Sequence, residues 1–496
     1  MTMQLFNTMT RRVEPFAPIA APRVSLYTCG PTVWSYAHIG NFRTFLFEDL
    51  LRRWLEASGY EVFQIMNLTD VDDRIISEAG KADTDIDSFV APFIKAFNED
   101  REWLRIRAPH AQPRATSYVP AMVRLVEGLL EKGVAYKGDD GSVYFSIERF
   151  PAYGRLSQLD KRELRTGASG RVASDEYAKE DARDFALWKA AQPQDEAVGA
   201  AWDAPFGRGR PGWHLECSAM ALDLVGERFG TDVLDIHAGG VDLIFPHHED
   251  EIAQSCAYTG QPDFARFWLH GEFLNIRGTK MSKRFGNLTT PRDLKTDGVD
   301  AGAVRLLVFQ THYRQKLDLT DDALDAAREG ARRLGEFGDR LDRVPVGPGS
   351  AAETAAATAL RSLVTEAMND DLNAPRAVAA LFDFVREGNR LLDGSRSAGP
   401  ELRAVWAWAG QVLDVAAAPG MVLNIKLTGL EVTAELGEVV AVVVGSEHWA
   451  RGLVGERILA RKERNFKRSD EIRDELKMNG WEVRDTKHGS EVVRTG

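Results

Sequence analysis

The sequence is poor in cysteine and lacks long apolar runs. It holds three cysteines in 496 residues, Cys29, Cys217 and Cys256. These are too few and too scattered for a disulfide framework, which favours a reducing compartment. No run approaches the about 18 apolar residues that span a membrane, and no apolar core of a secretion signal follows Met1. We therefore expect a cytoplasmic protein with no membrane partner.

The chain also lacks a surplus of positive charge. Its 62 Lys and Arg face 74 Asp and Glu, for a net charge of −12, and this whole-chain value alone argues against a nucleic-acid partner. Residues 451–496 have the opposite balance, with 12 Lys and Arg against 9 Asp and Glu. A local patch can therefore still suit an anionic partner.

The chain is too long for one hydrophobic core, because single cores stop growing at about 250 to 300 residues. Residues 24–28 form a β-prone run, residues 41–55 carry apolar side chains at helical spacing, and residues 60–70 alternate like a second strand. This order predicts a βαβ unit of a parallel nucleotide-binding sheet. Ligands of such sheets bind beyond the carboxyl ends of the strands.

The later texture predicts the domain order. From about residue 114 to 205 a helix, a hairpin-like stretch and a Gly-rich polar stretch interrupt the sheet pattern, and alanine-rich helices dominate after about residue 320. We expect an α/β, Rossmann-like catalytic domain in two halves, a connective insertion, an α-helical bundle and a small C-terminal region. The ranges are 1–113 and 206–320 for the halves, 114–205 for the insertion, 321–420 for the bundle and 421–496 for the C-terminal region.

Two loops have residues suited to phosphate groups. In "HIGN", Gly40 lets the backbone approach a ligand, and His38 precedes a helix whose N-terminal N–H groups favour anions. In "KMSKRFGN" (280–287), Lys280 and Lys283 suit the outer phosphates of a nucleoside triphosphate. Taken singly, His38 is also explained as a structural residue, and the two lysines as residues of a solvated surface loop. The pair of loops, about 240 residues apart, resembles the signature of class I aminoacyl-tRNA synthetases.

A third group has the residue types of a metal site. In "PHHEDE", Pro246 is placed to begin a helix on which His247 and Glu251 fall at i and i+4, while His248 points elsewhere. With the thiols of Cys29 and Cys217 they form a donor set that suits zinc. The alternative is that the cysteines are buried packing residues, which is our interpretation of Cys256.

Six segments together resemble the cysteinyl-tRNA synthetase family in order and spacing. They are "TCGPTVWSYAHIGN", "NLTDVDDRI", "DFALWKA", "GRGRPGWHLECSAM", "DIHAGGVDLIFPHHEDEIAQS" and "KMSKRFGN". The resemblance continues in residues 312–320, 367–392 and 460–486, and so covers most of the chain.

The resemblance implies a zinc ion held by Cys29, Cys217, His247 and Glu251, with the substrate cysteine bound through its sulfur. It assigns Trp213 to the wall over the substrate side chain and Thr69 to the substrate's amino end. It implies a catalytic role for His38, Lys280 and Lys283, with Mg²⁺ on the phosphates. The residues implied in ATP binding are His38, Gly40, Asn41, Lys280, Ser282 and Lys283. It also implies a monomer that binds ATP, L-cysteine and tRNA(Cys).

The implied reaction has two steps. The cysteine carboxylate attacks the α-phosphorus of ATP, giving cysteinyl-adenylate and pyrophosphate, and a ribose hydroxyl of the tRNA's terminal adenosine then attacks the adenylate carbonyl. Pocket shape separates serine from cysteine by only about 1–3 kcal/mol, whereas zinc prefers a thiolate. We therefore expect no hydrolytic editing domain. The family's loop usually reads Lys-Met-Ser-Lys-Ser; here Arg284 takes the last position, and we expect triphosphate binding to persist because both lysines are kept.

The basic C-terminal residues are candidates for tracking tRNA phosphates, and Trp481 for stacking on an unpaired base. The basic candidates are Arg461, Lys462, Arg464, Lys467 and Arg468. The alternative is a solvated helix face with i,i+4 ion pairs, which "RSDEIRDELK" supports.

Two other functions remain open at this point. One is a mycothiol-type ligase that joins cysteine to an amino sugar, and residues 420–496 argue against it because that ligase lacks the tRNA-binding part. The other is a non-catalytic paralogue that binds RNA or zinc, which the intact His38, Lys280 and Lys283 disfavour.

Overall fold

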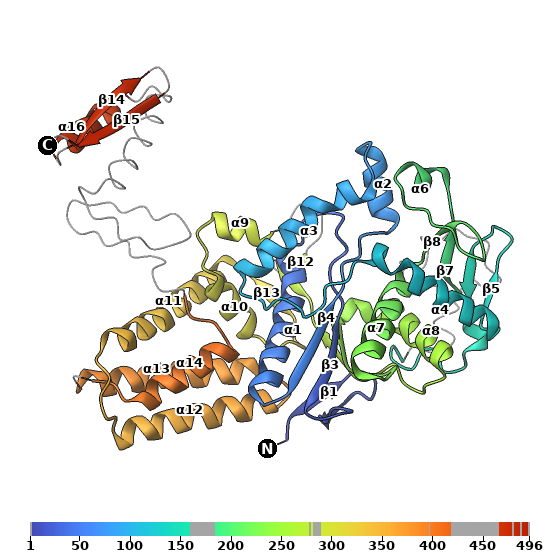
Figure 1. Cartoon of the computed structure of the whole chain (residues 1–496). Coiled ribbons are helices and arrows are strands. Elements are labelled where there is room, and N and C mark those ends of the chain that lie inside the picture. Colours follow the sequence, from blue (N-terminus) through green and yellow to red (C-terminus); the bar gives the residue numbers. More distant parts are fainter. Residues whose placement is uncertain are drawn as a thin grey trace. The chain divides into compact units, whose positions relative to one another are not determined.

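A computed structural model describes most of the chain in two compact units, residues 1–419 and 420–496, each of which is treated by itself (Figure 1). The residues described are 2–158, 184–276, 279–280, 289–395, 397–417, 466–478, 481–486 and 489–494. Among these residues no helix is both long and apolar enough to span a membrane.

A four-stranded parallel sheet forms the centre of the larger unit. Its strand order is β10 (Ala265–Gly271), β9 (Leu234–Gly240), β3 (Arg23–Thr28) and β4 (Glu61–Met66). The helix α1 (Ile39–Ala57) connects β3 to β4, which confirms the predicted βαβ unit. Because β3 pairs with β4 on one side and with the much later β9 on the other, the order reverses at β3. Ligand sites of such sheets lie at the carboxyl ends of the strands at this reversal.

The helix α1 is buried along most of its length and begins directly after His38, as expected, two residues before the apolar pattern that starts at residue 41. His38 is its N-cap: the His38 Nδ1 accepts from the backbone N–H of Asn41 at 3.2 Å, and the Asn41 Oδ1 accepts from the His38 N–H at 3.1 Å. This reciprocal cap satisfies two backbone donors at the helix start. The phosphate-type loop is therefore also the start of the helix.

The insertion forms its own antiparallel sheet of β5 (Ala135–Lys137), β6 (Val143–Phe145), β7 (Phe185–Ala190) and β8 (Gly209–Pro211). Since β8 pairs with β7, this sheet extends past the boundary predicted at residue 205. The helices α2 (Asp73–Lys81), α4 (Val119–Glu131) and α6 (Pro193–Ala197) adjoin this sheet, whereas α3 (Ile86–Trp103) packs against α1 through Phe97. Asp73 at the start of α2 pairs with Lys189 and Arg210, which ties α2 to β7 and β8.

The rest of the unit is mostly helical, as predicted. A short hairpin of β1 (Gln4–Asn7) and β2 (Arg12–Pro15) precedes the sheet, and β11 (Leu274–Ile276) pairs with β12 (Thr279–Lys280) and β13 (Leu317–Leu319). The helices are α7 (Trp213–Phe229), α8 (Glu249–Thr259), α9 (Pro291–Thr296), α10 (Ala301–Phe309), α11 (Asp321–Arg343), α12 (Ala351–Asn369), α13 (Ala374–Asp393) and α14 (Pro400–Val412). The last four form the bundle (Figure 1). Two of its three breaks fall at the predicted "VPVGPGS" and "GSRSAGP" stretches, and the third, at residues 370–373, was not predicted.

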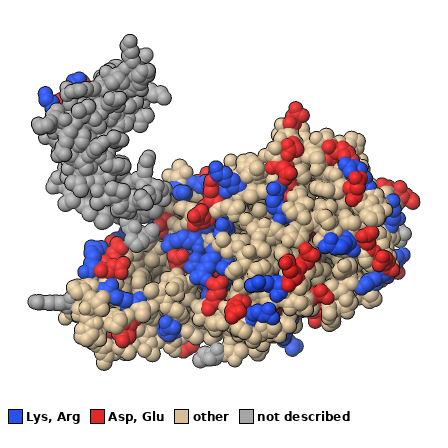
Figure 2. Space-filling view, viewed as in Figure 1, with Lys and Arg blue, Asp and Glu red and all other residues tan. Residues whose placement is uncertain are grey.

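The smaller unit contains α16 (Phe466–Met478) and an antiparallel hairpin of β14 (Trp481–Thr486) and β15 (Gly489–Arg494). Ile472 and Leu476 of α16 are buried. In the larger unit, Figure 2 shows acidic and basic side chains interspersed over the visible face.

Candidate active site and metal centre

Four buried ligand-type side chains meet near the carboxyl ends of β3 and β9. Cys29, Cys217, His247 and Glu251 each offer a ligand atom, and these atoms lie within 4.8 Å of one another. Cys29 directly follows β3, Cys217 lies on α7, His247 precedes α8 and Glu251 lies in its first turn. The structure thus brings together the four residues that the sequence resemblance proposed as metal ligands.

A second donor set overlaps the first. Cys29, His237, His248 and Glu251 also lie within 4.8 Å of one another, and the His248 Nε2 is 3.3 Å from the Cys29 Sγ. The expectation that His248 points elsewhere is therefore wrong. Residues 244–248 form a π-type turn with a non-helical Phe245 (φ −139°, ψ 132°), so the spacing of a regular helix does not apply to them.

His237 was missed in the sequence. It is fully buried in β9, and its Nε2 lies 2.9 Å from Glu251 Oε2. A signal was present, because a histidine between Ile236 and Ala238 in a buried strand requires a polar partner.

The charges in this cluster compensate one another. Burial opposes ionisation of Glu251, but His237 and His247 outweigh it and lower the pKa of Glu251 to about 2. Burial likewise opposes the charged form of His247, while Glu251 and Cys217 raise the pKa of His247 to about 10. A hydrogen bond with Cys29 lowers the pKa of Cys217 to about 6, and burial raises that of Cys29.

The donor set fits a zinc ion. Two sulfurs, an imidazole nitrogen and a carboxylate oxygen are all ligands that zinc takes at four-coordinate sites. Glu251 Oε1 is buried without a hydrogen bond of normal geometry, although it lies 3.0 Å from His247 Nε2. An orphaned oxygen of this kind is satisfied by a cation.

Cys256 lies outside both donor sets. It lies on α8 and is 6% exposed, and burial raises its pKa to about 12. The interpretation of Cys256 as a packing residue agrees with this position.

The residues proposed to contact the substrate amino acid surround the cluster. Trp213, the first residue of α7, is 39% exposed, and its ring centroid lies 4.4 Å from that of His247. Thr69 is buried after β4 and accepts a hydrogen bond from Asn67 Nδ2 at 3.1 Å. A glycine is required at Gly30, the residue after Cys29, because a Cβ at this position would fall 1.7 Å from the Asn67 carbonyl oxygen.

Glu216, next to Cys217 on α7, is a further buried acid that sequence reasoning missed. Both of its carboxyl oxygens are buried without a hydrogen bond of normal geometry. Burial, with Cys217, Asp70 and Asp72, raises the pKa of Glu216 well above its ordinary value.

The two phosphate-type loops are partly described. Gly40 and Asn41 form the first turn of α1 behind His38, and the backbone N–H of Ile39 donates to the Thr289 carbonyl at 2.8 Å. Lys280 is the last residue of β12 and pairs in register with Asn275. Ser282, Lys283 and Arg284 lie outside the described residues.

The basic tRNA candidates belong to the smaller unit. Lys467 and Arg468 lie in α16, and Trp481 begins β14. The remaining three, Arg461, Lys462 and Arg464, lie outside the described residues.

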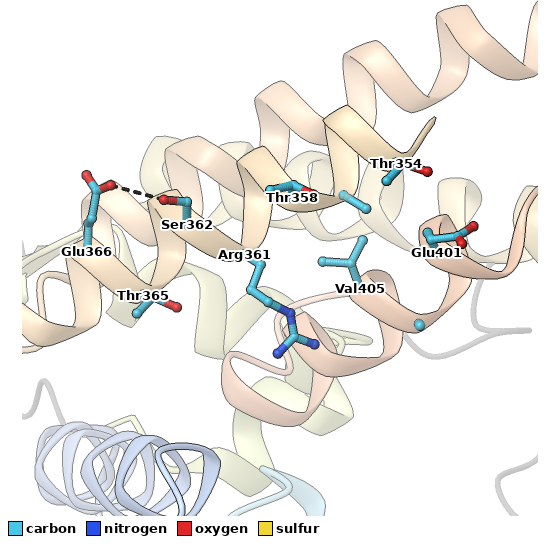
Figure 3. A pocket seen from close by; sticks show the side chains of 10 residues that line it. Thr354, Thr358, Arg361, Ser362, Thr365, Glu366, Glu401 and Val405 are labelled. Atoms are coloured by element: carbon cyan, nitrogen blue, oxygen red, sulfur yellow. Dashed lines mark hydrogen bonds between the residues drawn. The ribbon is translucent and has the colours of Figure 1, made fainter. Parts of the chain in front are cut away.

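A groove elsewhere in the unit has no part in this cluster. It has a volume of about 550 Å³ and lies between α12 and α14, where Arg361 and hydroxyl side chains of α12 face Glu401 and Val405 (Figure 3). None of the residues in the two donor sets lines this groove.

Comparisons with known proteins match both the core and the bundle. The family model of the class I (C) tRNA synthetase catalytic domain matches residues 15–329, and that of the DALR domain matches residues 364–415. A cysteine–tRNA ligase of Chlamydia abortus is 44% identical over 496 residues, which is 99% of this chain and 98% of the relative. One of Chlamydia trachomatis serovar A is 42% identical over 501 residues, covering 100% of both chains.

Solved structures share the fold at low sequence identity. Mycobacterium tuberculosis methionyl-tRNA synthetase in complex with methionyl-adenylate superposes with a TM-score of 0.56 at 16% identity, over 79% of this chain and 88% of that one. The Agrobacterium radiobacter K84 LeuRS in its ternary complex has a TM-score of 0.57 at 12% identity, over 81% and 84%.

Proposed function

The chain belongs to the cysteine–tRNA ligase family of class I synthetases, and from this premise we propose how its residues divide the work of that ligase. The enzyme joins cysteine to tRNA at the expense of ATP. The observation that carries the assignment of roles is the meeting of Cys29, Cys217, His247 and Glu251 at the strand-order reversal, where such sheets bind ligands.

We assign the metal site to these four residues, with zinc as the ion. Bound zinc would supply a soft Lewis acid that favours the substrate's thiolate over a serine hydroxyl. The chain's own contribution is to hold two sulfurs, a nitrogen and an oxygen in one buried place, and to cover them with the half-exposed ring of Trp213. Thr69, at the end of the neighbouring strand β4, is assigned to the substrate's amino group.

Activation of the substrate takes place beside this pocket. The substrate carboxylate attacks the α-phosphorus of ATP, the bond to the β-phosphate oxygen breaks, and pyrophosphate leaves. We assign the positioning of the triphosphate to His38, Gly40 and Asn41 at the N-terminus of α1, whose N–H groups and dipole attract anions. Lys280, Ser282 and Lys283 are assigned to the phosphates from the opposite loop.

The remaining assignments follow from family membership. They are Mg²⁺ on the phosphates, tRNA(Cys) as the RNA substrate, tRNA contacts from the C-terminal region, and a monomeric, cytoplasmic enzyme. The matched relatives extend over the C-terminal region as well, which favours a tRNA acceptor over an amino sugar.

Pyrophosphate exchange followed by charging of total tRNA tests the activity. Cysteine should support exchange, serine should not, and labelled cysteine should appear on tRNA. Exchange without charging would instead favour the amino-sugar ligase. Absence of exchange would favour a non-catalytic paralogue.

A pair of cysteine variants tests the metal ligands. Cys217→Ser should weaken zinc binding by more than about 100-fold, because loss of an outer partner of a ligand alone costs about 10- to 100-fold, and should allow exchange with serine. Cys256→Ser is the matched control, since Cys256 is equally buried but outside the cluster, and should keep wild-type zinc content. Equal zinc content in the two variants would show that the ligand set is wrong.

A further inference from the structure

A chain of polar side chains in close contact runs from the insertion to the cluster. The Tyr153 hydroxyl donates to Asp250 Oδ1, Asp250 Oδ2 lies 3.3 Å from His214 Nε2, and His214 Nδ1 lies 3.0 Å from His247 Nδ1. The other nitrogen of His247 faces Glu251. Tyr153 and Asp250 are 8% and 1% exposed, so water does not replace these partners.

A metal ion bound at the cluster side of His247 would need the lone pair of Nε2, so the proton of the neutral ring would lie on Nδ1. Two imidazole nitrogens 3.0 Å apart share one proton, so one ring donates and the other accepts. With His214 Nε2–H directed at Asp250 Oδ2, 3.3 Å away, the His214 Nδ1 has a lone pair that accepts from the Nδ1–H of His247. This arrangement would leave the Nε2 of His247, the nitrogen that faces Glu251, available to a metal ion.

The insertion itself is held against α8 by a neighbouring acid. Glu249 accepts from the backbone N–H groups of Gly154 at 2.8 Å and Ser157 at 2.7 Å. These two bonds fix the turn that carries Tyr153. The tyrosine hydroxyl is thereby presented to Asp250 by a segment about 100 residues away in sequence.

We propose that Asp250 and Tyr153 are positioning residues for the metal ligand His247, acting through His214. Outer partners of ligating histidines orient the ring and fix its tautomer. Here the outer partner is a second histidine, and the insertion supplies the last member. This inference rests on the proposed zinc site.

The test is the zinc dissociation constant of the metal-stripped full chain, measured by competition with a chromophoric chelator, with the Co²⁺ absorption spectrum as a report on ligand geometry. Asp250→Leu removes the acceptor and should weaken zinc binding by about 10- to 100-fold. Asp250→Asn keeps an acceptor oxygen and should restore affinity to within about threefold of wild type, since the single bond at issue is kept.

Tyr153→Phe keeps the packing and removes one hydroxyl, and should weaken zinc binding by about 2- to 10-fold, the effect of one hydrogen bond. Its matched control is Tyr144→Phe, because Tyr144 donates to Asp140 at 2.7 Å within the insertion but does not contact the cluster. Tyr153→Phe also serves if Asp250→Leu fails to fold.

The outcomes separate this inference from the metal site. Wild-type protein that binds no zinc contradicts the proposed site itself. Wild-type binding with an unchanged constant in Asp250→Leu or in Tyr153→Phe, or with Asp250→Asn as weak as Asp250→Leu, overturns the positioning role alone.

Discussion

Replacing Arg305 by methionine should cost the larger unit a substantial part of its stability. Arg305 lies on α10 and is fully buried. Its guanidinium lies 2.9 Å from Asp49 of α1 and donates to the Leu413 carbonyl at 3.1 and 3.2 Å and to the Leu104 carbonyl at 3.2 Å. The helix α1 begins at the His38 loop. Arg305 therefore links this helix to the end of the bundle at Leu413.

The size of the expected stability loss follows from the polar groups that the substitution leaves without a partner. Two buried carbonyl oxygens lose their donor, at about 1–3 kcal/mol each. Asp49 keeps Arg53 at 2.7 Å and the backbone N–H of Arg107 at 3.0 Å, so it is only partly stranded. Breaking a buried ion pair from one side typically costs about 3–5 kcal/mol, and we expect Arg305→Met to fall in that range. Arg305→Met with Asp49→Asn should lose about 1–3 kcal/mol less than the two single losses added.

Urea unfolding followed by tryptophan fluorescence measures these losses as the midpoint shift multiplied by a shared slope. Arg332→Met is the matched control, since Arg332 pairs with Glu329 and Glu336 on the exposed face of α11 and should leave the midpoint unchanged. A midpoint for Arg305→Met equal to that of Arg332→Met would refute the reasoning. So would strictly additive losses in the double variant.

Three further substitutions test the site and its supports. Burial raises the pKa of Asp73, but the charges of Arg210 and Lys189 outweigh burial and hold that pKa below its ordinary value. The ion pairs of Asp73 therefore stabilise the folded protein above the unfolded pKa of about 3.9. This stabilisation is lost as the pH falls through the folded pKa. Asp73→Asn should thus flatten the fall of the thermal midpoint between about pH 5 and pH 3, and an unchanged slope would contradict this. Gly30→Ala should displace Cys29 and reduce zinc content, whereas Gly226→Ala on α7, with nothing within 4 Å of its Cβ, should keep it; metal analysis of both variants decides. Trp213→Ala should raise the KM for cysteine in pyrophosphate exchange and leave that for ATP unchanged, and equal changes in both would remove Trp213 from the amino-acid pocket.

The parts of the fold that could be predicted from sequence are those set by local pattern. The β3–α1–β4 unit and the bundle follow from strand alternation, helical spacing and Gly/Pro breaks, all of which act over a few residues. The expectation that His38 directly precedes the helix α1 is confirmed. The strand β8, which lies beyond the expected insertion boundary, was not predicted because Gly209–Pro211 is too short to show a strand pattern and is defined by its pairing with β7.

The site was less accessible because its contacts depend on tertiary structure. Cys29 and His248 are 219 residues apart, and their contact depends on β9 pairing beside β3. The orientation of the His248 side chain was predicted wrongly because the spacing of a regular helix was applied to a π-type turn. His237 and Asp250 each have partners on other segments, and no local pattern names those partners.

The segment 247–251 shows how a run of polar side chains can be accommodated in a protein core. All five of its consecutive side chains are polar and at most 2% exposed, and burial of any of them without a partner would be costly. Their partners come from Cys29 after β3, from α7, β9 and β10, and from the insertion. The cost is therefore offset only when all these segments are assembled, so the site and the docking of the insertion form together. The buried polar side chains of residues 247–251 thereby favour one arrangement of the surrounding chain. Any other arrangement would leave part of their hydrogen-bond network unsatisfied, which is less stable than an apolar core.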